Sequence, residues 1–312
     1  MTPAEPGGRG FRTGVVAVAP AATRGEWLDR VRRIDDQGHD ALLMPDHLGL
    51  WPPLTPLVVA AGASDRLRLG TQVLDNEFWN PVLLAREAAA ADVLTDGRLE
   101  LGLGAGHAAV EFAASGIPYD PPGVRVGRLA EAVPLVRRLL AGEVVNHDGA
   151  YRLEGAATGL ATAQSPVPVM VGGNGDRVLR IAAEHADIVG LVGVTAGTGR
   201  VHTDLSHFTW DGLVDRIAHV RRCAGPRFEG LELSVLVQRV TIAQDRRVAA
   251  EEFAGGADVD VLLDSPFALF GSEAAIAEQL DRLRTEHGVT YVTTFEHSAE
   301  TLGAIRGHLA RQ

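Results

Sequence analysis

Short apolar runs alternate with longer amphipathic stretches along most of the chain. The first apolar run covers Gly14–Ala19, and a helical pattern follows in which Trp27, Val31 and Ile34 fall on one face. Gly38 stands where that helix should end, since glycine readily adopts the backbone conformation that closes a helix. Regular alternation of this kind is typical of βαβ units, which build a parallel sheet covered by helices.

Seven more apolar runs continue the pattern and predict strands over residues 41–47, 67–75, 98–104, 166–172, 186–193, 231–242 and 289–295. One interruption occurs at Asp148-Gly149, which lies between β-type runs and predicts a hairpin. About eight strand–helix units without a separating linker predict one α/β domain over residues 1–312, a (β/α)8 TIM barrel with 1–12 as a flexible leader. In this fold the active site forms at the C-terminal ends of the strands.

Composition and charge narrow the functional classes. Formal net charge is −11, so the electrostatic footprint that nucleic acids or anionic lipids require is absent. No apolar run approaches the roughly 18 residues of a membrane span, and the first ten residues lack the apolar core of a secretory signal. Cys223 is the single cysteine and cannot form an internal disulfide. We therefore expect a cytoplasmic protein that binds neither nucleic acid nor membrane.

The ends of the second and third predicted strands carry candidate chemistry. Asp46 and His47 follow the second strand and combine a carboxylate with an imidazole, the groups wanted for proton transfer. The structural alternative is that Asp46 caps the next turn and His47 packs on it. Gln72, at the end of the third strand, offers donors and acceptors for a heterocycle. Trp79 is either an apolar wall for a planar ligand or a residue that packs at the start of a helix.

The fourth strand enters the glycine-rich stretch Gly104–Ala109, which formally satisfies the dinucleotide fingerprint G-x-G-x-x-A. That fingerprint belongs to the first βα turn of its domain, whereas three complete units come first here. The acidic residue expected about 20 positions later falls at Asp120, in a proline-rich loop. We therefore do not expect a nicotinamide dinucleotide at this turn.

The end of the fifth strand, Gly172-Gly173-Asn174, leads into a helix whose free amides could hold an anion such as phosphate. The polar segment 195–207 is either a lid or an irregular excursion. Its His202 and His207 lack a carboxylate framework, so we expect no metal site. Sequence signatures of serine hydrolases, zinc proteases and P-loop nucleotide hydrolases are missing from the chain.

Taken in order, the segments PDH, LGTQVLD, REAAAADVLTDGRLELGLGAG, HDGAYRL and PVPVMVGGNGDRVLRIAAEHADIVG resemble the luciferase-like monooxygenase superfamily, within it the branch that depends on coenzyme F420. The resemblance is continuous over residues 14–192 and looser beyond. It implies a (β/α)8 barrel with a hairpin insertion, in agreement with the count of strands.

The resemblance also implies a role for each strand end. Asp46 would contact the deazaflavin, and His47 would lie beside its reactive carbon. Thr71, Gln72 and Val73 match a site that often contains a cis peptide bulging against the ring. The remaining cofactor contacts would be Ala105 and Gly106 beside the ring system, and Gly172, Gly173 and Asn174 at the phosphate.

Departures from the family pattern refine the hypothesis. Luciferases that use flavin mononucleotide (FMN) tend to place an arginine where this chain has Ala105, which favours F420 over FMN. His107 occupies the position of a glutamate acid in some sugar-phosphate dehydrogenases of the family, so it is the second catalytic candidate after His47. Phe78, Trp79 and Tyr119 are the expected substrate-contacting residues.

The sequence therefore predicts an F420-dependent oxidoreductase that transfers a hydride between the cofactor and a small-molecule or peptide substrate, as a reductase of an electrophilic C=C, C=N or C=O bond. The alternatives are an FMN-dependent monooxygenase fed by a partner reductase, and a non-catalytic flavin-binding barrel. By resemblance we expect a homodimer, with a flavin or F420 reductase as the source of reduced cofactor.

Overall fold

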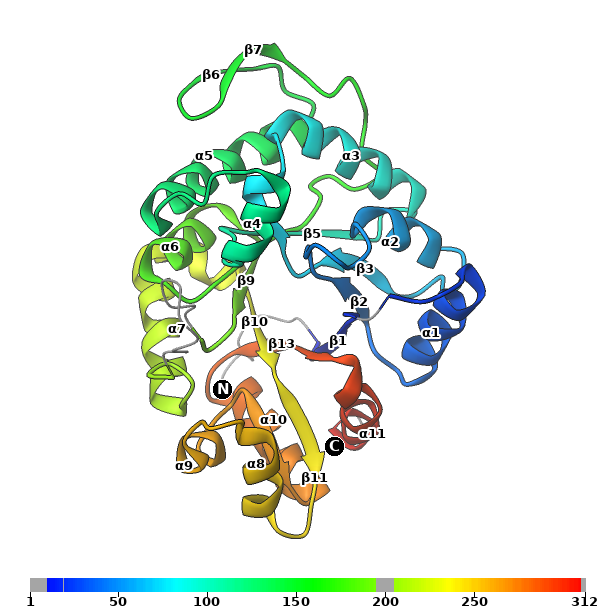
Figure 1. The fold of residues 1–312 in the computed structure, drawn as a ribbon, viewed down its shortest axis with the longest axis vertical. Coiled ribbons are helices and arrows are strands. Elements are labelled where there is room, and N and C mark those ends of the chain that lie inside the picture. The colour runs from blue at the N-terminus through cyan, green and yellow to red at the C-terminus, as the bar shows by residue number, and fades with distance from the viewer. Residues whose placement is uncertain (1–9, 19, 195–204, 310–312) are drawn as a thin grey trace, which may run out of the picture.

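A closed ring of eight parallel strands forms the centre of the molecule (Figure 1). The computed structural model describes residues 10–18, 20–194 and 205–309. Around the ring the strands are β3 (Arg68–Thr71), β2 (Ala41–Met44), β1 (Arg12–Val16), β13 (Val289–Phe295), β10 (Glu232–Val237), β9 (Ile188–Leu191), β8 (Val169–Gly172) and β5 (Leu99–Gly104). Pairing of β3 with β5 closes the ring, so the predicted barrel is confirmed.

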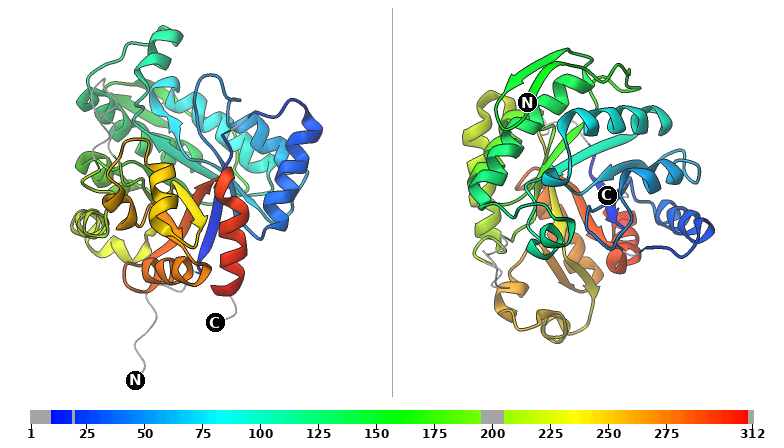
Figure 2. Two further views of the ribbon diagram at one scale, coloured as in Figure 1. Left: turned by 60° about the horizontal axis from the view of Figure 1, so that its bottom comes forward. Right: turned by 45° about the horizontal axis from the view of Figure 1, so that its top comes forward.

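Helices surround the barrel, as the two rotated views show (Figure 2). They are α1 (Arg24–Asp36), α2 (Leu54–Ala60), α3 (Pro81–Leu94), α5 (Pro122–Leu140), α6 (Asp176–His185), α7 (Trp210–Ala224), α10 (Glu273–Thr285) and α11 (Ala299–Leu309). Local sequence sets their starts: the Asn80 side chain accepts hydrogen bonds from the first amides of α3, and Pro81 occupies the position where proline fits a helix. None of the described helices is long and apolar enough to cross a membrane.

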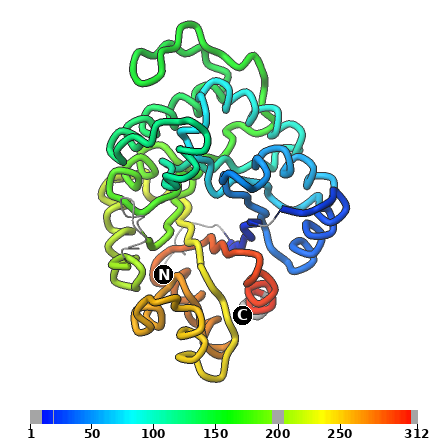
Figure 3. Tube along the Cα trace, in the orientation of Figure 1, coloured from blue at the N-terminus to red at the C-terminus, as the bar shows by residue number. Residues whose placement is uncertain are grey.

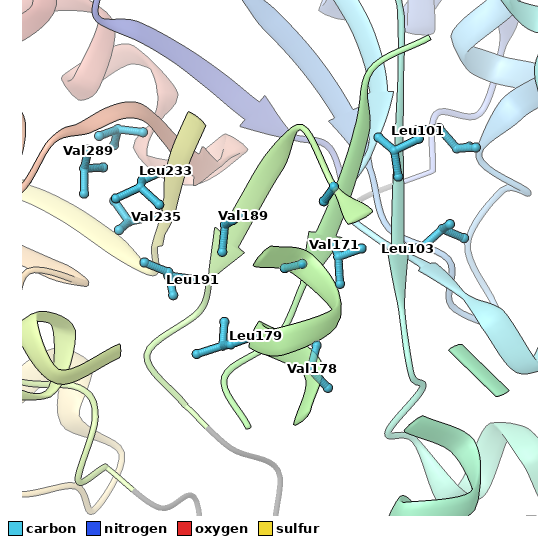
Figure 4. Packing of buried hydrophobic residues seen from close by; sticks show 14 of the residues in the cluster. Leu101, Leu103, Val171, Val178, Leu179, Val189, Leu191, Leu233, Val235 and Val289 are labelled. Carbon is cyan, nitrogen blue, oxygen red and sulfur yellow. The ribbon is translucent and has the colours of Figure 1, made fainter. Parts of the chain in front are cut away.

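The main core lies between the strands and the outer helices. Figure 4 shows Val171 of β8 and Val189 of β9 facing Leu179 of α6, and all three side chains are fully buried. Burying an aliphatic side chain of this size stabilises the fold by roughly 1.5–3 kcal/mol. β8, whose end carries the predicted phosphate site, is therefore anchored from its outer side.

An ion cluster occupies the N-terminal ends of the strands. The Arg12 guanidinium donates to Glu232 at 2.6 and 2.8 Å and to Glu100 at 2.6 Å, and it lies 3.6 Å from the centroid of the Tyr291 ring. Arg12 begins β1, so the predicted leader over 1–12 extends too far; these contacts are the physical reason. Residues 1–9 lie outside the described residues.

Several predicted runs, such as 41–47 and 166–172, form shorter strands, here β2 and β8, and three runs are shifted or divided. The run 14–19 forms β1, which starts two residues earlier and ends at Val16. The run 67–75 divides into β3 and β4 (Leu74–Asp75) at the Gln72–Val73 peptide bond, which is cis, as the resemblance implied. The run 231–242 divides into β10 and β11 (Arg239–Ile242), and β11 leaves the barrel to pair with β12 (Ala268–Gly271).

The sequence pattern missed α8 (Arg246–Ala254) and α9 (Val259–Leu263), which lie with β12 between β11 and α10. These elements are short, and α8 buries little more than Ala249 and Ala250, so no extended apolar period marks them.

The predicted hairpin is present as antiparallel β6 (Val145–Asp148) and β7 (Arg152–Ala156), and the Cα trace shows it projecting beyond α5 (Figure 3). His147 Nε2 lies 2.8 Å from Glu131 Oε2, which ties the hairpin to α5. The short 3₁₀ helices η1 (Asn76–Phe78), η2 (Gly225–Gly230) and η3 (Glu296–Ser298) complete the described elements, together with α4 (Ala109–Ser115), which follows β5.

Candidate functional site

His47 follows the C-terminal end of β2 and is held by a carboxylate from α4. Its Nδ1 lies 2.9 Å from Glu111 Oε1, while the other oxygen of Glu111 accepts a hydrogen bond from the Leu48 amide at 3.3 Å. A carboxylate accepts hydrogen bonds, so we assign the proton on the neutral imidazole to Nδ1. The Nε2 lone pair of His47 is then free to act on a ligand.

His107 comes from the end of β5 and meets His47 edge to face, with ring centroids 5.3 Å apart and planes at 88°. Burial lowers the pKa of His107, and a positive charge on the neighbouring His47 would lower it further, although part of residue 107 faces solvent. Two strands that are separate in sequence thus bring both predicted catalytic histidines together.

Arg125 of α5 clamps the turn that precedes His107. Its side chain is buried, donates to the carbonyls of Ala105 and Gly106 at 3.3 Å each, and lies 4.2 Å from the ring centroid of Tyr119. The Tyr119 hydroxyl in turn donates to the His107 carbonyl at 3.1 Å. The predicted substrate residue Tyr119 therefore contacts the backbone of the candidate catalytic segment.

Asp46 lies beside the histidines and is held by Trp79. Asp46 Oδ2 accepts from Trp79 Nε1 at 2.8 Å and from the Asp75 amide at 3.3 Å. Burial raises the pKa of Asp46, and these two hydrogen bonds oppose the rise. Burial also raises the pKa of Asp75, to about 6, and the negative charges of Asp46 and Glu77 add to that increase.

Position 106 requires glycine because of both its backbone conformation and the little space around its Cα atom. Its φ is +72°, and a Cβ at this position would lie 2.4 Å from the carboxylate oxygens of Asp75. The second glycine of the apparent fingerprint thus allows close approach to a buried carboxylate within the protein.

Val73 lies among glycines of the neighbouring strands. A Cβ on Gly104 would lie 2.6 Å from Val73 Cγ2, and one on Gly172 would lie 2.9 Å from Val73 Cγ1. Because Gly104 and Gly172 carry no side chains, they make room for the segment that joins β3 and β4 at the barrel mouth.

Thr71 and Gln72 flank that segment. The Thr71 hydroxyl donates to the Gly102 carbonyl at 2.9 Å and accepts from the Gly102 amide at 2.8 Å. The Gln72 side chain is buried, and its Oε1 has no hydrogen-bond partner among the described residues. A buried acceptor without a partner is costly, which marks Gln72 as a position where a ligand donor would fit.

The predicted phosphate site lies where β8 passes into α6. Asn174 is buried, and Gly175, which precedes α6, has no side chain to cap the first turn, so a ligand could accept hydrogen bonds from the amides there. Arg177 donates to the Gly123 carbonyl at 3.1 Å, which places a cation at the same edge. The Arg216 guanidinium bonds to Asp176 and lowers the pKa of that carboxyl.

Phe78 and Trp79 line a hollow of about 320 Å³ together with Leu54, Leu83 and neighbouring residues of α2 and α3. Phe78 also packs on Phe112 of α4, with ring centroids 5.5 Å apart, and Phe112 packs on Tyr119 at 5.0 Å. The three predicted substrate residues thus belong to one aromatic region, but Tyr119 lies outside the lining of the hollow.

Sequence reasoning missed Glu111, Arg125 and Asp75. One signal existed for Glu111, which follows His107 by four residues and can therefore return toward the same strand ends. Residues 195–204, including His202, lie outside the described residues, so the choice between a lid and an irregular excursion stays open. Among residues that are described, no group of three or more potential ligands could hold a metal ion.

A closed parallel barrel with paired imidazoles and a buried carboxylate at the strand ends has the architecture of a TIM-barrel enzyme. The chain belongs to the luciferase-like monooxygenase family, whose family model matches residues 10–305. The resemblance drawn from the sequence motifs is confirmed.

Curated relatives carry names that refer to coenzyme F420. The F420-dependent glucose-6-phosphate dehydrogenase of Intrasporangium calvum is 34% identical over 186 residues, which cover 56% of this chain and 55% of the relative. The enzyme of the same name from Nakamurella multipartita is 28% identical over 251 residues, 78% of this chain and 71% of the relative. The matched segment spans about half the length of the first of these relatives.

Solved structures share the fold. The coenzyme F420-dependent tetrahydromethanopterin reductase of Methanopyrus kandleri has a TM-score of 0.75 at 16% identity and covers 96% of this chain and 98% of its own. An F420-dependent secondary alcohol dehydrogenase in complex with an F420–acetone adduct has a TM-score of 0.74 at 17% identity, covering 92% and 93%. At these identities the likeness shows the barrel fold.

Proposed function

We propose that this protein is an F420-dependent oxidoreductase that transfers a hydride between the deazaflavin and an organic substrate. The observation that carries the proposal is the His47–Glu111 pair meeting His107 at the barrel mouth. The names of the curated relatives support the choice of cofactor.

The residues present fit a deazaflavin. Gln72 Oε1 is a buried acceptor with no partner among the described residues, so an N–H of the ring system could donate to it. The glycines around Val73 make room for the segment that joins β3 and β4 at the barrel mouth. Asp46, Thr71, Gln72, Val73, Ala105 and Gly106 would hold the ring system. Gly172, Gly173, Asn174 and the first amides of α6 would hold the phosphate. Position 105 is alanine and not arginine, which favours F420 over FMN.

Bound F420 would supply or accept the hydride. The chain would move the accompanying proton. In a reduction, the doubly protonated form of His47 would donate it from Nε2 to the substrate atom that does not receive the hydride, which leaves the neutral Nδ1–H ring; in an oxidation, the Nε2 lone pair of that neutral ring would take the proton back. Glu111 offsets the positive charge of the imidazolium. His107, with its lowered pKa, would be neutral near pH 7 and is the second proton-transfer candidate.

We propose a reductase of C=C, C=N or C=O bonds as the substrate class, with Phe78, Trp79 and Tyr119 contacting the substrate. His107 stands where sugar-phosphate dehydrogenases of the family have a glutamate, so their substrate is not carried over to this chain. A substrate panel should therefore pair glucose 6-phosphate and a secondary alcohol with enones and imines.

A parallel titration with F420 and FMN, followed by fluorescence, tests the proposal. We expect F420 to bind and to exchange hydride with a panel substrate, and H47A to lose at least about tenfold in turnover while F420 still binds. FMN binding with oxygen consumption would instead support the monooxygenase alternative. Binding of neither cofactor by the folded protein would support the non-catalytic barrel.

The proposal includes a homodimer in the cytoplasm that receives reduced cofactor from a separate reductase. Exposed apolar side chains on α3 support self-association, since Leu83 is 50% and Leu94 61% exposed and they lie three turns apart on one face. Light scattering should give twice the chain mass, and charged substitutions at these two leucines should give the monomer. A monomeric wild-type protein would contradict the dimer.

A further inference from the structure

We propose that Glu111 is a positioning residue, which fixes the tautomer and orientation of the His47 imidazole so that Nε2 faces the reacting atoms. The catalytic part of this inference rests on the proposed function, whereas the tautomer can be measured without any cofactor. Glu111 itself touches His47 and the Leu48 amide and is not assigned to the substrate.

The geometry restrains His47 in two ways. One oxygen of Glu111 accepts from the ring nitrogen and the other accepts from the amide of the next residue, so ring and backbone are held by one carboxylate. The Glu111 side chain is 15% exposed and the His47 side chain 36%. A partly buried pair is screened less by water than a surface pair, which strengthens the restraint.

α4 itself is held in place, so the carboxylate has a defined position. Phe112, the next residue after Glu111, is fully buried and packs between Phe78 and Tyr119. The Arg125 guanidinium lies 5.8 Å from its ring centroid. Glu111 is therefore presented from an anchored helix to the end of a different strand, as precise orientation of a side chain requires.

Among the described residues, the ionisable groups found beside His47 are Glu111 from α4, His107 from the end of β5 and its own neighbour Asp46. Only Glu111 forms a hydrogen bond with the His47 ring among the described contacts. Removal of its carboxylate should therefore free the imidazole to exchange its proton between the two nitrogens.

The chain contains a matched control. Glu131 and His147 form a second carboxylate–imidazole contact, at 2.8 Å, between α5 and the hairpin that projects from the barrel. E131Q removes a carboxylate of the same kind from a histidine outside the candidate site. It should leave His47 and turnover unchanged.

Nitrogen-15 NMR of the imidazole rings in the cofactor-free protein at pH 8.5 decides the inference. We expect His47 to be protonated on Nδ1 in the wild type and in E131Q, and to become a mixture of tautomers in E111A. E111Q keeps an oxygen acceptor and should retain most of the Nδ1–H form. E111L fills the same space without an acceptor, so it should also give a mixture of tautomers and replaces E111A if that variant folds poorly. An unchanged His47 tautomer in folded E111A would overturn the proposal.

Turnover with F420 provides the second measurement. E111A should lose on the order of 100-fold in turnover, the low end of a positioned acid–base contribution, with unchanged F420 affinity. E111Q should recover part of that loss. Equal losses in E111A and E111Q, without a tautomer change, would mean a purely structural role. If wild-type protein binds no F420, the proposed function fails while the NMR result still decides the positioning role.

Discussion

The indole nitrogen of Trp79 donates a hydrogen bond to the carboxylate of Asp46 over 2.8 Å. This contact joins the residue expected to form the substrate wall to the residue expected to touch the cofactor. A hydrogen bond to a charged acceptor contributes roughly 1.5–3 kcal/mol. The W79F substitution keeps an aromatic wall but removes the donor, so it should raise the pKa of Asp46 further and weaken F420 binding about tenfold or more.

A fluorescence titration of W79F with F420 measures that effect. W210F is the matched control, because Trp210 lies in α7, a helix to which we assign no contact with the cofactor. The control should bind F420 as the wild type does. Equal affinity of W79F and wild type would show that the Trp79–Asp46 contact is unimportant for the cofactor.

Replacement of Gly102 or Gly104 in β5 by alanine should destabilise the fold, and a second substitution should restore stability in only one of the two cases. A Cβ on Gly102 would lie 2.0 Å from the Thr71 carbonyl oxygen, which is backbone, whereas a Cβ on Gly104 would meet the Val73 side chain. G102A should therefore cost about 4 kcal/mol or more in unfolding free energy, and G104A roughly 1–3 kcal/mol. Urea unfolding of both variants tests this order.

The rescue separates the two causes. V73A should restore much of the stability of G104A, because it removes the atom that the new Cβ meets, and should not restore G102A. G230A is the control, since nothing lies within 4 Å of its Cβ position. Equal rescue of both glycine variants by V73A would contradict the assigned contacts.

His39 should make the fold sensitive to acid. The ring is fully buried between the Thr13 hydroxyl and the Ala299 carbonyl, and burial lowers its pKa from 6.5 to about 4. Between those values the unfolded chain binds a proton that the folded protein excludes. Stability therefore falls as the pH drops from 6.5 to 4, by up to about 1.4 kcal/mol per pH unit.

Chemical unfolding of wild type and H39Q at pH 7, 5.5 and 4 isolates this contribution. The stability advantage of the wild type should shrink by roughly 3 kcal/mol from pH 7 to pH 4. Parallel stability curves for the two proteins would show that His39 does not produce the acid sensitivity.

The Arg12 cluster should contribute to stability in proportion to its burial. R12M leaves the buried Glu232 carboxylate without its cation, which costs about 3–5 kcal/mol in comparable pairs, while Glu100 keeps its ion pair with Arg68 at 2.7 Å. The double variant R12M/E232Q should lose less than R12M alone. R32M, which breaks the exposed pair with Asp29, should keep the wild-type midpoint. Equal midpoints of R12M and R32M would contradict a stabilising cluster.

Periodicity predicted the barrel well because its strands and helices repeat one simple arrangement. It failed between β11 and α10, where the elements are short and bury few side chains, and at Arg12, whose strand position depends on Glu100 and Glu232 far away in sequence. An interaction between residues so distant in the chain leaves no local pattern to read.

The candidate site also contains some residues that the sequence predicts and others that it does not. His47, His107 and Asp46 follow strand ends, so topology alone predicts that they meet. Glu111 and Arg125 reach the site from helices, and their contacts depend on how α4 and α5 pack across the mouth. Side-chain direction at that level is set by tertiary packing rather than by the sequence of one element.

The space around Val73 has a consequence for engineering this barrel. Val73 occupies space that is open because Gly104 and Gly172, on two different strands, carry no side chains. A change at any one of these three positions therefore alters what the other two tolerate. Libraries that aim to reshape the mouth should vary these positions together. Scans of single sites would discard substitutions that succeed only in combination.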